Sequence, residues 1–510
     1  MTCWYQINPF YFAQIAKLKG WSDRPESISF YSLVKQNLDR ISALGCDGLW
    51  IMPVYERGLV NRKGVYGSPY AIREYQLDPV WGSEEELKNL ILRAKEMGFK
   101  VIGEYVPNHL APDAPFLRNE EGLFYRDAEG QPYFDQNWSD TVKLNHSHPA
   151  VQGFTRANLL WLTRYFGFEG FRLDMAHYPL HGANPAGKVN FGDGDPDFWH
   201  KVLDHPDLLE LDLIAEVYDD QSKEYYGYQD HLTLIKDGIK VYDKKIHDLL
   251  AWRLLHQPLH SDLQTKLYEE LYIQSQIIHL AGLKSNPFLR LPSNHDDCPG
   301  VKIYGGYREF LCAIALQALL PGDLMIYAGE EYGHKVKPSV TGENISDKLG
   351  HLHESNQLRF LEIGEQKDLY TQIQTILKIR SSPMLQSSKH FLMVRLGEQI
   401  SDQVNQKLVA YTRFSPDTHD LIFFATNLNR HGAKSWARIS HFFPTFDYPP
   451  HEFEWTELLN WVFPEMVSKG YQVRDLKTGK LLSQVHKTND ELWIGLDPLE
   501  YQILKIEPFG

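Results

Sequence analysis

Hydrophobic positions in the first three quarters of the chain follow two alternating patterns. Short apolar runs of strand length alternate with longer stretches in which apolar residues recur at helical spacing. This alternation is typical of βα units around a parallel sheet rather than of a β-sandwich. Eight such runs predict a closed (β/α)8 TIM barrel. The expected strands are residues 4–10, 48–53, 100–106, 170–174, 211–216, 238–242, 288–292 and 323–327.

One intervening helix carries signals at both of its ends. Ser83 is a candidate N-cap, Glu86 stands where a capping-box partner would stand, and Met97 with Gly98 offers a stop. We therefore expect a helix between these positions. Its apolar face is expected to consist of Leu87, Leu90, Ile91 and Ala94.

Two parts of the chain depart from the βα pattern. Residues 110–145 are rich in Pro, Asp, Asn and aromatics without a clear period, and so long a loop is either functional or misassigned. After about Ser388 the chain changes to short runs rich in Val, Ile, Phe and Tyr, which favour strands. We therefore predict a barrel domain over residues 1–109 and 146–385, a short insertion over 110–145, and a C-terminal all-β sandwich domain over 386–510.

Composition narrows the expected partners. The 510 residues carry a net charge of −14 with a pI near 5.9, so nucleic acid would meet a repulsive average field. Aromatic residues reach 13%, which suits either carbohydrate binding or the filling of a large core. The four cysteines form no CxxC pair, and the chain has neither a signal-peptide pattern nor a run of about 18 apolar residues. We expect a soluble cytoplasmic protein without a membrane partner, and no oligomeric state is predicted.

Polar residues that end the apolar runs are the candidates for chemistry, because catalytic groups of a parallel barrel lie at the carboxyl ends of its strands. Four runs end in this way. The third ends in Asn108 and His109 after Glu104, the fourth in Arg172 and Asp174, the fifth in Glu216, and the seventh is followed by the polar cluster Asn294, His295, Asp296 and Asp297.

These four runs, in this order and after these strands, resemble the four conserved sequence regions of the α-amylase superfamily, glycoside hydrolase family 13. Residues 4–7, 68–82 and 320–331 resemble further stretches of the same family. The resemblance covers residues 1–380 by motif and the C-terminal β domain by arrangement, and it assigns no subfamily.

The resemblance implies a retaining enzyme of α-glucosidic bonds, with an oligosaccharide or glucan as its substrate. Hydrolysis with retention needs two carboxyl groups about 5–5.5 Å apart, one attacking the anomeric carbon and one protonating the leaving oxygen. Asp174 is the expected nucleophile, held as an anion by Arg172. Glu216 is the expected general acid/base, with burial or neighbouring negative charge raising its pKa. Asp296 would stabilise the transition state.

The same resemblance implies supporting roles for the surrounding residues. His109 and His295 would donate hydrogen bonds to the sugar, Tyr70 would stack on it, and Arg172, beside Asp174, would also belong to the substrate-binding residues. Glu104 stands where the family has Asp, so a longer side chain would have to orient Arg172. Asn108 matches a calcium ligand of some family members, whereas the acidic residues of 110–145 show no EF-hand spacing, so we predict no metal or other cofactor and leave calcium as the open alternative. Residues 184–197 lie after the fourth strand, where family members place loops that set subsite shape, and they resemble no particular subfamily signature.

Three further interpretations stay open at this level. Water or a sugar acceptor could attack the intermediate, so a glucanotransferase or a maltosyl or glucosyl transferase is the alternative to a hydrolase. A non-catalytic binding protein could share the fold, although decayed members would be expected to lose one of the three carboxylates. A phosphate-dependent transferase would need a basic anion site, for which Arg290 and Lys302 are the candidates.

Overall fold

The computed structural model covers the whole chain and describes most of it. It leaves undescribed residues 22–27, 65–66, 120, 128, 135–137, 182–193, 219–226, 256–262, 338–339, 341–358, 389, 396–407, 433, 440, 443–453, 465–469, 486–491 and 510.

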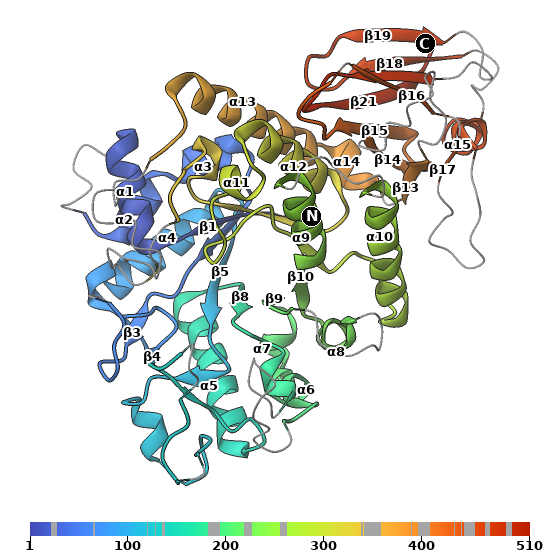
Figure 1. Cartoon of the computed structure of the whole chain (residues 1–510). Coiled ribbons are helices and arrows are strands. Elements are labelled where there is room, and N and C mark those ends of the chain that lie inside the picture. The colour runs from blue at the N-terminus through green and yellow to red at the C-terminus, as the bar shows by residue number, and fades with distance from the viewer. Residues whose placement is uncertain are drawn as a thin grey trace.

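Eight parallel strands close into a barrel at the centre of the molecule (Figure 1). Each falls within, or within one residue of, an expected run, so the prediction of a (β/α)8 barrel is confirmed. Around the barrel the order is β1, β12, β11, β10, β9, β8, β5 and β2. Their bounds are β1 Cys3–Ile7, β2 Gly48–Ile51, β5 Lys100–Tyr105, β8 Gly170–Leu173, β9 Asp212–Ala215, β10 Lys240–Tyr242, β11 Phe288–Arg290 and β12 Asp323–Tyr327.

Helices surround this barrel and bury their apolar faces against it. In α4 (Glu84–Glu96) the hydroxyl of Ser83 accepts the N–H of Glu86, whose carboxylate accepts the N–H of Ser83, as the capping-box prediction requires. Its buried residues are the four predicted ones. The other helices are α1 Pro9–Lys19, α2 Phe30–Gln36, α3 Leu38–Leu44, α5 Pro149–Phe166, α6 Phe198–Leu203, α7 Pro206–Leu209, α8 Gln229–Lys236, α9 Lys244–Leu255, α10 Leu263–Leu280, α11 Gly300–Ile303, α12 Tyr307–Leu319 and α13 Ile363–Arg380.

Large side chains fill the inside of the barrel. Because side chains alternate along each strand, every strand sends residues both inward and toward the helices. The inward cluster contains Trp4, Trp50, Ile102, Ile214, Tyr242, Leu289, Leu291 and Met325, each at most 1% exposed. The barrel is thus a packed core, and ligands can reach only its ends.

Two small antiparallel ladders lie at the end of the barrel that is formed by the carboxyl ends of its strands. Strands β3 (Tyr55–Arg57) and β4 (Ile72–Leu77) pair after β2, and β6 (His109–Leu110) pairs with β7 (Val142–Lys143) after β5. The second ladder closes the segment 110–145, which also holds the 3-10 helix η2 (Pro115–Arg118). The pairing of β6 with β7 thus holds both ends of this segment together, directly after strand β5. The domain boundaries proposed from the sequence stay a prediction.

The C-terminal part forms an antiparallel sheet beside α12 and α13, as the predicted all-β domain requires (Figure 1). One sheet has the order β17, β13, β14, β15, β21, β18, β19, and β16 pairs with β20 separately. A helix that the sequence pattern did not predict, α15 (Trp455–Val462), packs its apolar face onto this core. The strands are β13 His390–Arg395, β14 Leu408–Ser415, β15 Asp420–Asn427, β16 Ser435–Ile439, β17 His441–Phe442, β18 Tyr471–Asp475, β19 Leu481–Val485, β20 Leu492–Leu496 and β21 Glu500–Pro508, preceded by α14 Pro383–Ser387.

Polar contacts join the C-terminal sheet to the barrel helices. The hydroxyl of Tyr411 donates to the carbonyl of Leu316 at 2.6 Å, and Arg413 donates to that of Leu319 at 3.1 Å.

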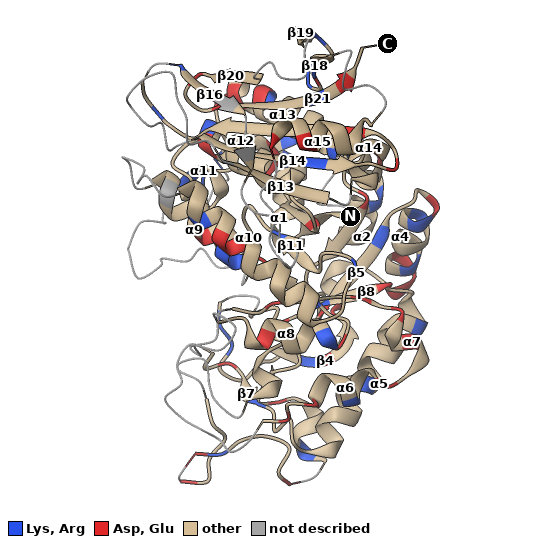
Figure 2. Ribbon diagram, turned by 90° about the vertical axis from the view of Figure 1, so that its right-hand side faces the viewer, with Lys and Arg blue, Asp and Glu red and all other residues tan. Residues whose placement is uncertain are grey.

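Acidic and basic residues are interspersed along outer helices such as α4 and α9 (Figure 2). Within the described ranges, no helix is both long and apolar enough to cross a membrane.

Candidate active site

A cavity of about 280 Å³ opens where the barrel strands end, and all three predicted catalytic carboxylates line it. Asp174 follows β8, Glu216 follows β9 and Asp296 lies in the loop after β11. Three separate strands thus bring these groups to one place, as the rule for barrel strand ends predicts. The lining residues are Lys63, Ser68, Tyr70, His109, Trp138, Asp140, Thr141, Asp174, Met175, Glu216, Tyr218 and Asp296.

The buried guanidinium of Arg172 joins the carboxylates together. Its Nη1 lies 2.8 Å from Asp174 Oδ1 and 3.0 Å from Glu104 Oε2, and its Nη2 lies 2.8 Å from Glu216 Oε2. The longer side chain of Glu104 therefore reaches Arg172, and its other oxygen accepts Trp50 Nε1–H at 2.7 Å. The pairing of Arg172 with Asp174 was expected, but the pairing with Glu216 was not.

Burial works against the charge on this cluster. It raises the pKa of Asp174 well above its usual range, with Arg172 opposing the change, and raises the pKa of Glu104 for the same reason. The lowered pKa expected for Asp174 is thus wrong for the free protein, because desolvation outweighs the neighbouring cation. Asp174 and Glu104 share the guanidinium of Arg172, so the charge on both carboxylates depends on this one cation.

Glu216 is held by three donors. Besides Arg172, it accepts the backbone N–H of Met175 at 2.9 Å and the hydroxyl of Tyr218 at 2.6 Å. Met175 has φ of 45°, a left-handed conformation that is strained for a residue with a side chain. This strain falls directly after Asp174 and coincides with the N–H contact to Glu216. The chain is thus bent where the two carboxylates meet.

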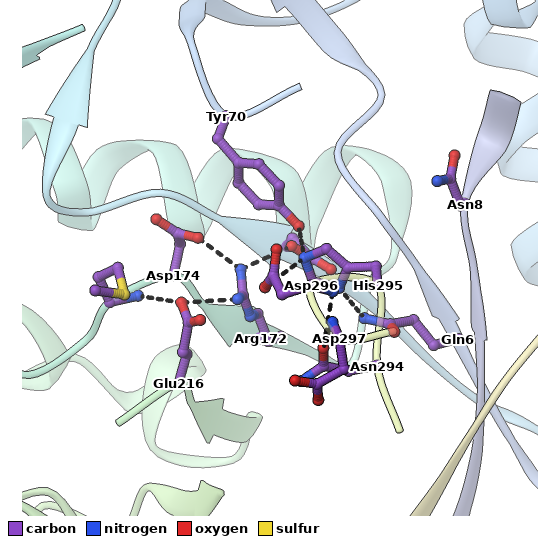
Figure 3. A network of polar contacts seen from close by, with 12 residues as sticks. Gln6, Asn8, Tyr70, Arg172, Asp174, Glu216, Asn294, His295, Asp296 and Asp297 are labelled. Carbon is purple, nitrogen blue, oxygen red and sulfur yellow. Dashed lines mark hydrogen bonds and ion pairs between the residues drawn. The ribbon is translucent and has the colours of Figure 1, made fainter. Parts of the chain in front are cut away.

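Tyr70 and His295 form a second part of the site, as Figure 3 shows. The Tyr70 hydroxyl lies 2.6 Å from His295 Nε2, and Gln6 Nε2 lies 3.2 Å from His295 Nδ1. His295 Nε2 also lies 3.1 Å from Asp296 Oδ2, whose side chain is 50% exposed toward the cavity. Asp296 still lies deep enough for lost solvation to raise its pKa. With Gln6 donating to Nδ1, His295 presents its Nε2–H to the site.

Asn108 and His109 lie where the β6–β7 ladder begins. His109 is buried, its Nδ1 lies 3.1 Å from Asn108 Nδ2, and its ring lies against Trp138 from the segment 110–145. Burial lowers the pKa of both His109 and His295 to about 3, so both rings are neutral at pH 7. Trp138, Asp140 and Thr141 make that segment part of the cavity wall. Of the two readings of this long loop, the functional one is therefore supported.

The described residues around Asn108 include no cluster of acidic side chains for a calcium ion. No three His, Cys, Asp or Glu side chains converge within the described part of the chain, although Asn108 Oδ1 is buried without a hydrogen bond. Asp140 pairs with Lys63 at 2.9 Å and Asp127 accepts the N–H groups of its own turn, while Asp135 lies outside the described residues. Burial lowers the pKa of His109 and His146, and the buried cation Lys143 lowers both pKa values further.

Removing divalent metal is therefore expected to leave the protein intact. Lys143 is opposite His109 in the β6–β7 ladder and places a buried positive charge beside it. After dialysis against EDTA, we expect activity within about twofold of the untreated protein and an unchanged Tm. A loss of activity that added calcium restores would contradict this expectation.

The candidates for a phosphate site do not meet in the cavity. Arg290 is buried on the outer side of the barrel wall, where it contacts Asp243 and donates to Gln274 at 2.8 Å. Lys302 lies in α11, and neither residue lines the cavity. Most of the loop expected at 184–197 lies outside the described residues.

The sequence analysis did not predict several residues of the site. Tyr218 stands two residues after Glu216, the same spacing that places Arg172 and Asp174 side by side at the end of β8, so the sequence could have indicated it. Tyr242 ends β10 and accepts Arg172 Nε–H at 3.3 Å, and the strand-end rule would have found it. Gln6 lies on β1 and gives no signal until its partner His295 is placed, because the two are 289 positions apart.

Known proteins with similar sequences include enzymes that are related to α-amylases. Residues 32–122 match the family model described as alpha amylase, catalytic domain. The chain is 24% identical over 473 residues to a cyclomaltodextrinase of Geobacillus thermopakistaniensis, covering 85% of this chain and 70% of that protein. It is 23% identical over 525 residues to an alpha-1,4-glucan:maltose-1-phosphate maltosyltransferase of Cereibacter sphaeroides, covering 98% of this chain and 66% of that protein.

The fold has solved counterparts. A maltogenic α-amylase from Thermotoga neapolitana superposes with a TM-score of 0.66 at 19% identity, covering 94% of this chain and 95% of the other. At this identity the likeness concerns the fold, and the chemistry must be argued from the site.

Proposed function

Because this chain is a member of the α-amylase superfamily, we propose that it is a retaining enzyme of α-glucosidic bonds with an α-glucan or malto-oligosaccharide as its substrate. The observation that carries the proposal is the cavity lined by Asp174, Glu216 and Asp296, with the first two held on the guanidinium of Arg172. A shared guanidinium is compatible with the separation of about 5–5.5 Å that retention requires.

The first step forms a glycosyl–enzyme intermediate. An oxygen of Asp174 attacks the anomeric carbon while Glu216 gives its proton to the glycosidic oxygen, so the bond to the leaving sugar breaks as the bond to Asp174 forms. Glu216 leaves this step as a carboxylate. Arg172, Met175 N–H and the Tyr218 hydroxyl then stabilise its charge.

The second step releases the sugar. Glu216 takes a proton from water or from a sugar hydroxyl, whose oxygen attacks the anomeric carbon and frees Asp174. Configuration is retained because the anomeric carbon is inverted twice. In both steps Asp296 faces the developing positive charge, and the neutral His295 and His109 hold sugar hydroxyls beside Tyr70.

Transfer to a sugar acceptor is the second candidate, favoured by the maltosyltransferases among the relatives. Trp138 and Tyr218 add aromatic surface to the cavity, on which an acceptor ring could lie. Phosphate as the acceptor is less well supported, since Lys63 is the basic residue in the lining and pairs with Asp140. A non-catalytic binding role would leave the full carboxylate set without a purpose.

Incubation with maltoheptaose tests the proposal. The wild-type protein should convert it to other malto-oligosaccharides over time, and the anomer first released should be the α form. Shorter products alone indicate hydrolysis, whereas products longer than the substrate indicate transfer. Release of the β anomer, or no turnover of maltoheptaose, maltose or starch, would contradict the proposal.

Tyr218→Phe is expected to lower kcat by about 10-fold or more. The change removes the hydroxyl that donates to Glu216 at 2.6 Å, and hydrogen bonds to charged groups are worth about 1.5–3 kcal/mol. Steady-state kinetics on maltoheptaose measure the effect.

Tyr165→Phe is the matched control, because the Tyr165 hydroxyl donates to Glu84 at 2.5 Å on the surface of α5. This variant should keep the wild-type kcat. A wild-type kcat in Tyr218→Phe as well would show that the hydrogen bond from Tyr218 to Glu216 does not support catalysis.

A further inference from the structure

A second pocket lies between the barrel and the C-terminal sheet. Its volume is about 240 Å³, and among the described residues it shares none of the lining of the carboxylate cavity. One side is formed by α10 and by residues 284–286 before β11, and the other by β13, β14 and α15. Figures 1 and 2 both place α10 next to β13 and β14, and Gln264 at the start of α10 donates to the carbonyl of Val394.

The side formed by the C-terminal sheet is aromatic. The ring centroids of His390 and Phe414 are 5.1 Å apart, as are those of Phe414 and Trp461 and those of His390 and Trp461. Phe414 is buried under the other two rings, whereas Trp461 keeps 41% of its surface exposed. The cluster is therefore a rigid support that presents the Trp461 indole and the His390 imidazole to a ligand.

The side formed by the barrel is polar. Asn286 uses its side-chain oxygen to accept the N–H of Phe288 at 2.9 Å, and its amide nitrogen has no hydrogen bond within the described residues. Lys284 and Ser285 are exposed beside it. Behind them Arg290 is fully buried with its Nη2 unpaired, which marks a place for an oxygen of a water or a ligand.

We propose that this pocket binds a glucosyl unit of an α-glucan, at a site separate from the carboxylates. A sugar ring combines an apolar C–H face, which suits the Trp461 indole, with hydroxyls that can accept from Lys284 and Asn286. The volume, slightly below the roughly 300–1,000 Å³ of pockets for drug-sized ligands, suits one or two rings rather than a long chain. The identity of the ligand rests on the proposed function.

Such a site would hold a long glucan to the enzyme while another part of the chain is cleaved. The gain applies only to substrates long enough to reach both places, because linking two binding events raises the effective concentration of the second. Short oligosaccharides gain nothing from it. The pocket thus distinguishes polymer from oligomer without changing the chemistry.

Binding of the full-length protein to insoluble starch, measured by sedimentation, tests this proposal. Trp461→Ala should weaken binding at least fivefold, whereas Trp461→Phe, which keeps an aromatic face, should retain most of it. Trp436→Ala is the control, since Trp436 is 49% exposed in the same sheet domain but lies outside the pocket. Turnover of maltotriose by Trp461→Ala should stay within twofold of wild type, which also shows that the variant is folded.

The outcomes separate this site from the catalytic one. Asp174→Asn should bind starch as the wild type does while cleaving nothing. Wild-type binding by Trp461→Ala, or an equal loss in Trp436→Ala, would overturn the pocket proposal and leave the catalytic one intact. A protein that binds starch through Trp461 but does not cleave maltoheptaose would overturn the catalytic proposal alone.

Discussion

Asp174→Asn is expected to lower kcat/KM on maltoheptaose by at least about 10⁴-fold, because the amide cannot form the covalent bond that the double displacement requires. The amide has nearly the shape of the carboxyl group. It can keep one oxygen on Arg172 Nη1, where Asp174 Oδ1 lies at 2.8 Å. Starch binding and Tm should therefore stay near the wild-type values. Chromatography of the products over time measures the effect.

Asp207→Asn is a suitable control, because Asp207 pairs with Arg164 on the surface of the barrel helices. Surface ion pairs contribute little, about 0–1 kcal/mol, so this variant should match the wild type in both activity and stability. Comparable activity in Asp174→Asn and wild type would remove Asp174 from the mechanism.

Arg172→Met is expected to have the second largest effect, on stability as well as on activity. The substitution leaves Glu104, Asp174 and Glu216 buried without their shared cation. Removing one partner of a buried ion pair destabilises a protein by about 3–5 kcal/mol. We expect a loss of that order in the free energy of unfolding and at least a 10³-fold loss of kcat/KM, since neither carboxylate keeps its orientation.

Arg172→Lys separates charge from geometry. A lysine ammonium is a point charge that cannot hold three carboxylates in fixed positions, so this variant should recover stability more than activity. Denaturant unfolding and kcat/KM are measured on both variants. Equal recovery of stability and activity would show that Arg172 supplies charge alone and does not position the two carboxylates.

The sequence was sufficient for the barrel because each strand is buried on both faces. Strands of this kind appear as short apolar runs, and the eight runs were found from that signal. The capping box at Ser83 was also local, since both of its hydrogen bonds lie within four residues. Helix α15 was not predicted at all, because its apolar residues Trp455, Leu458, Leu459 and Val462 lie in a stretch whose neighbours favour strands. The β3–β4 pairing was missed because its strands are short and irregular.

The candidate site was predictable where polar residues end strands, and less so where contacts join distant parts of the chain. Asp174, Glu216 and Asp296 were found from their positions, and the structure brings them to one cavity. The contact of Arg172 with Glu216 depends on the closure of the barrel, which sequence spacing does not describe. The pKa of Asp174 was predicted in the wrong direction because the depth of burial, which decides it, is a property of the packed structure.

The central claim is that Asp174 forms a covalent bond to the sugar, and trapping that intermediate tests it most directly. In Glu216→Gln, a maltosyl fluoride can still react, because fluoride leaves without needing a proton, but no base remains to activate water. Mass spectrometry of the digested protein should find one maltosyl group on the peptide that contains Asp174. A maltosyl group on a different residue, or steady turnover of the fluoride with no labelled peptide, would contradict the account.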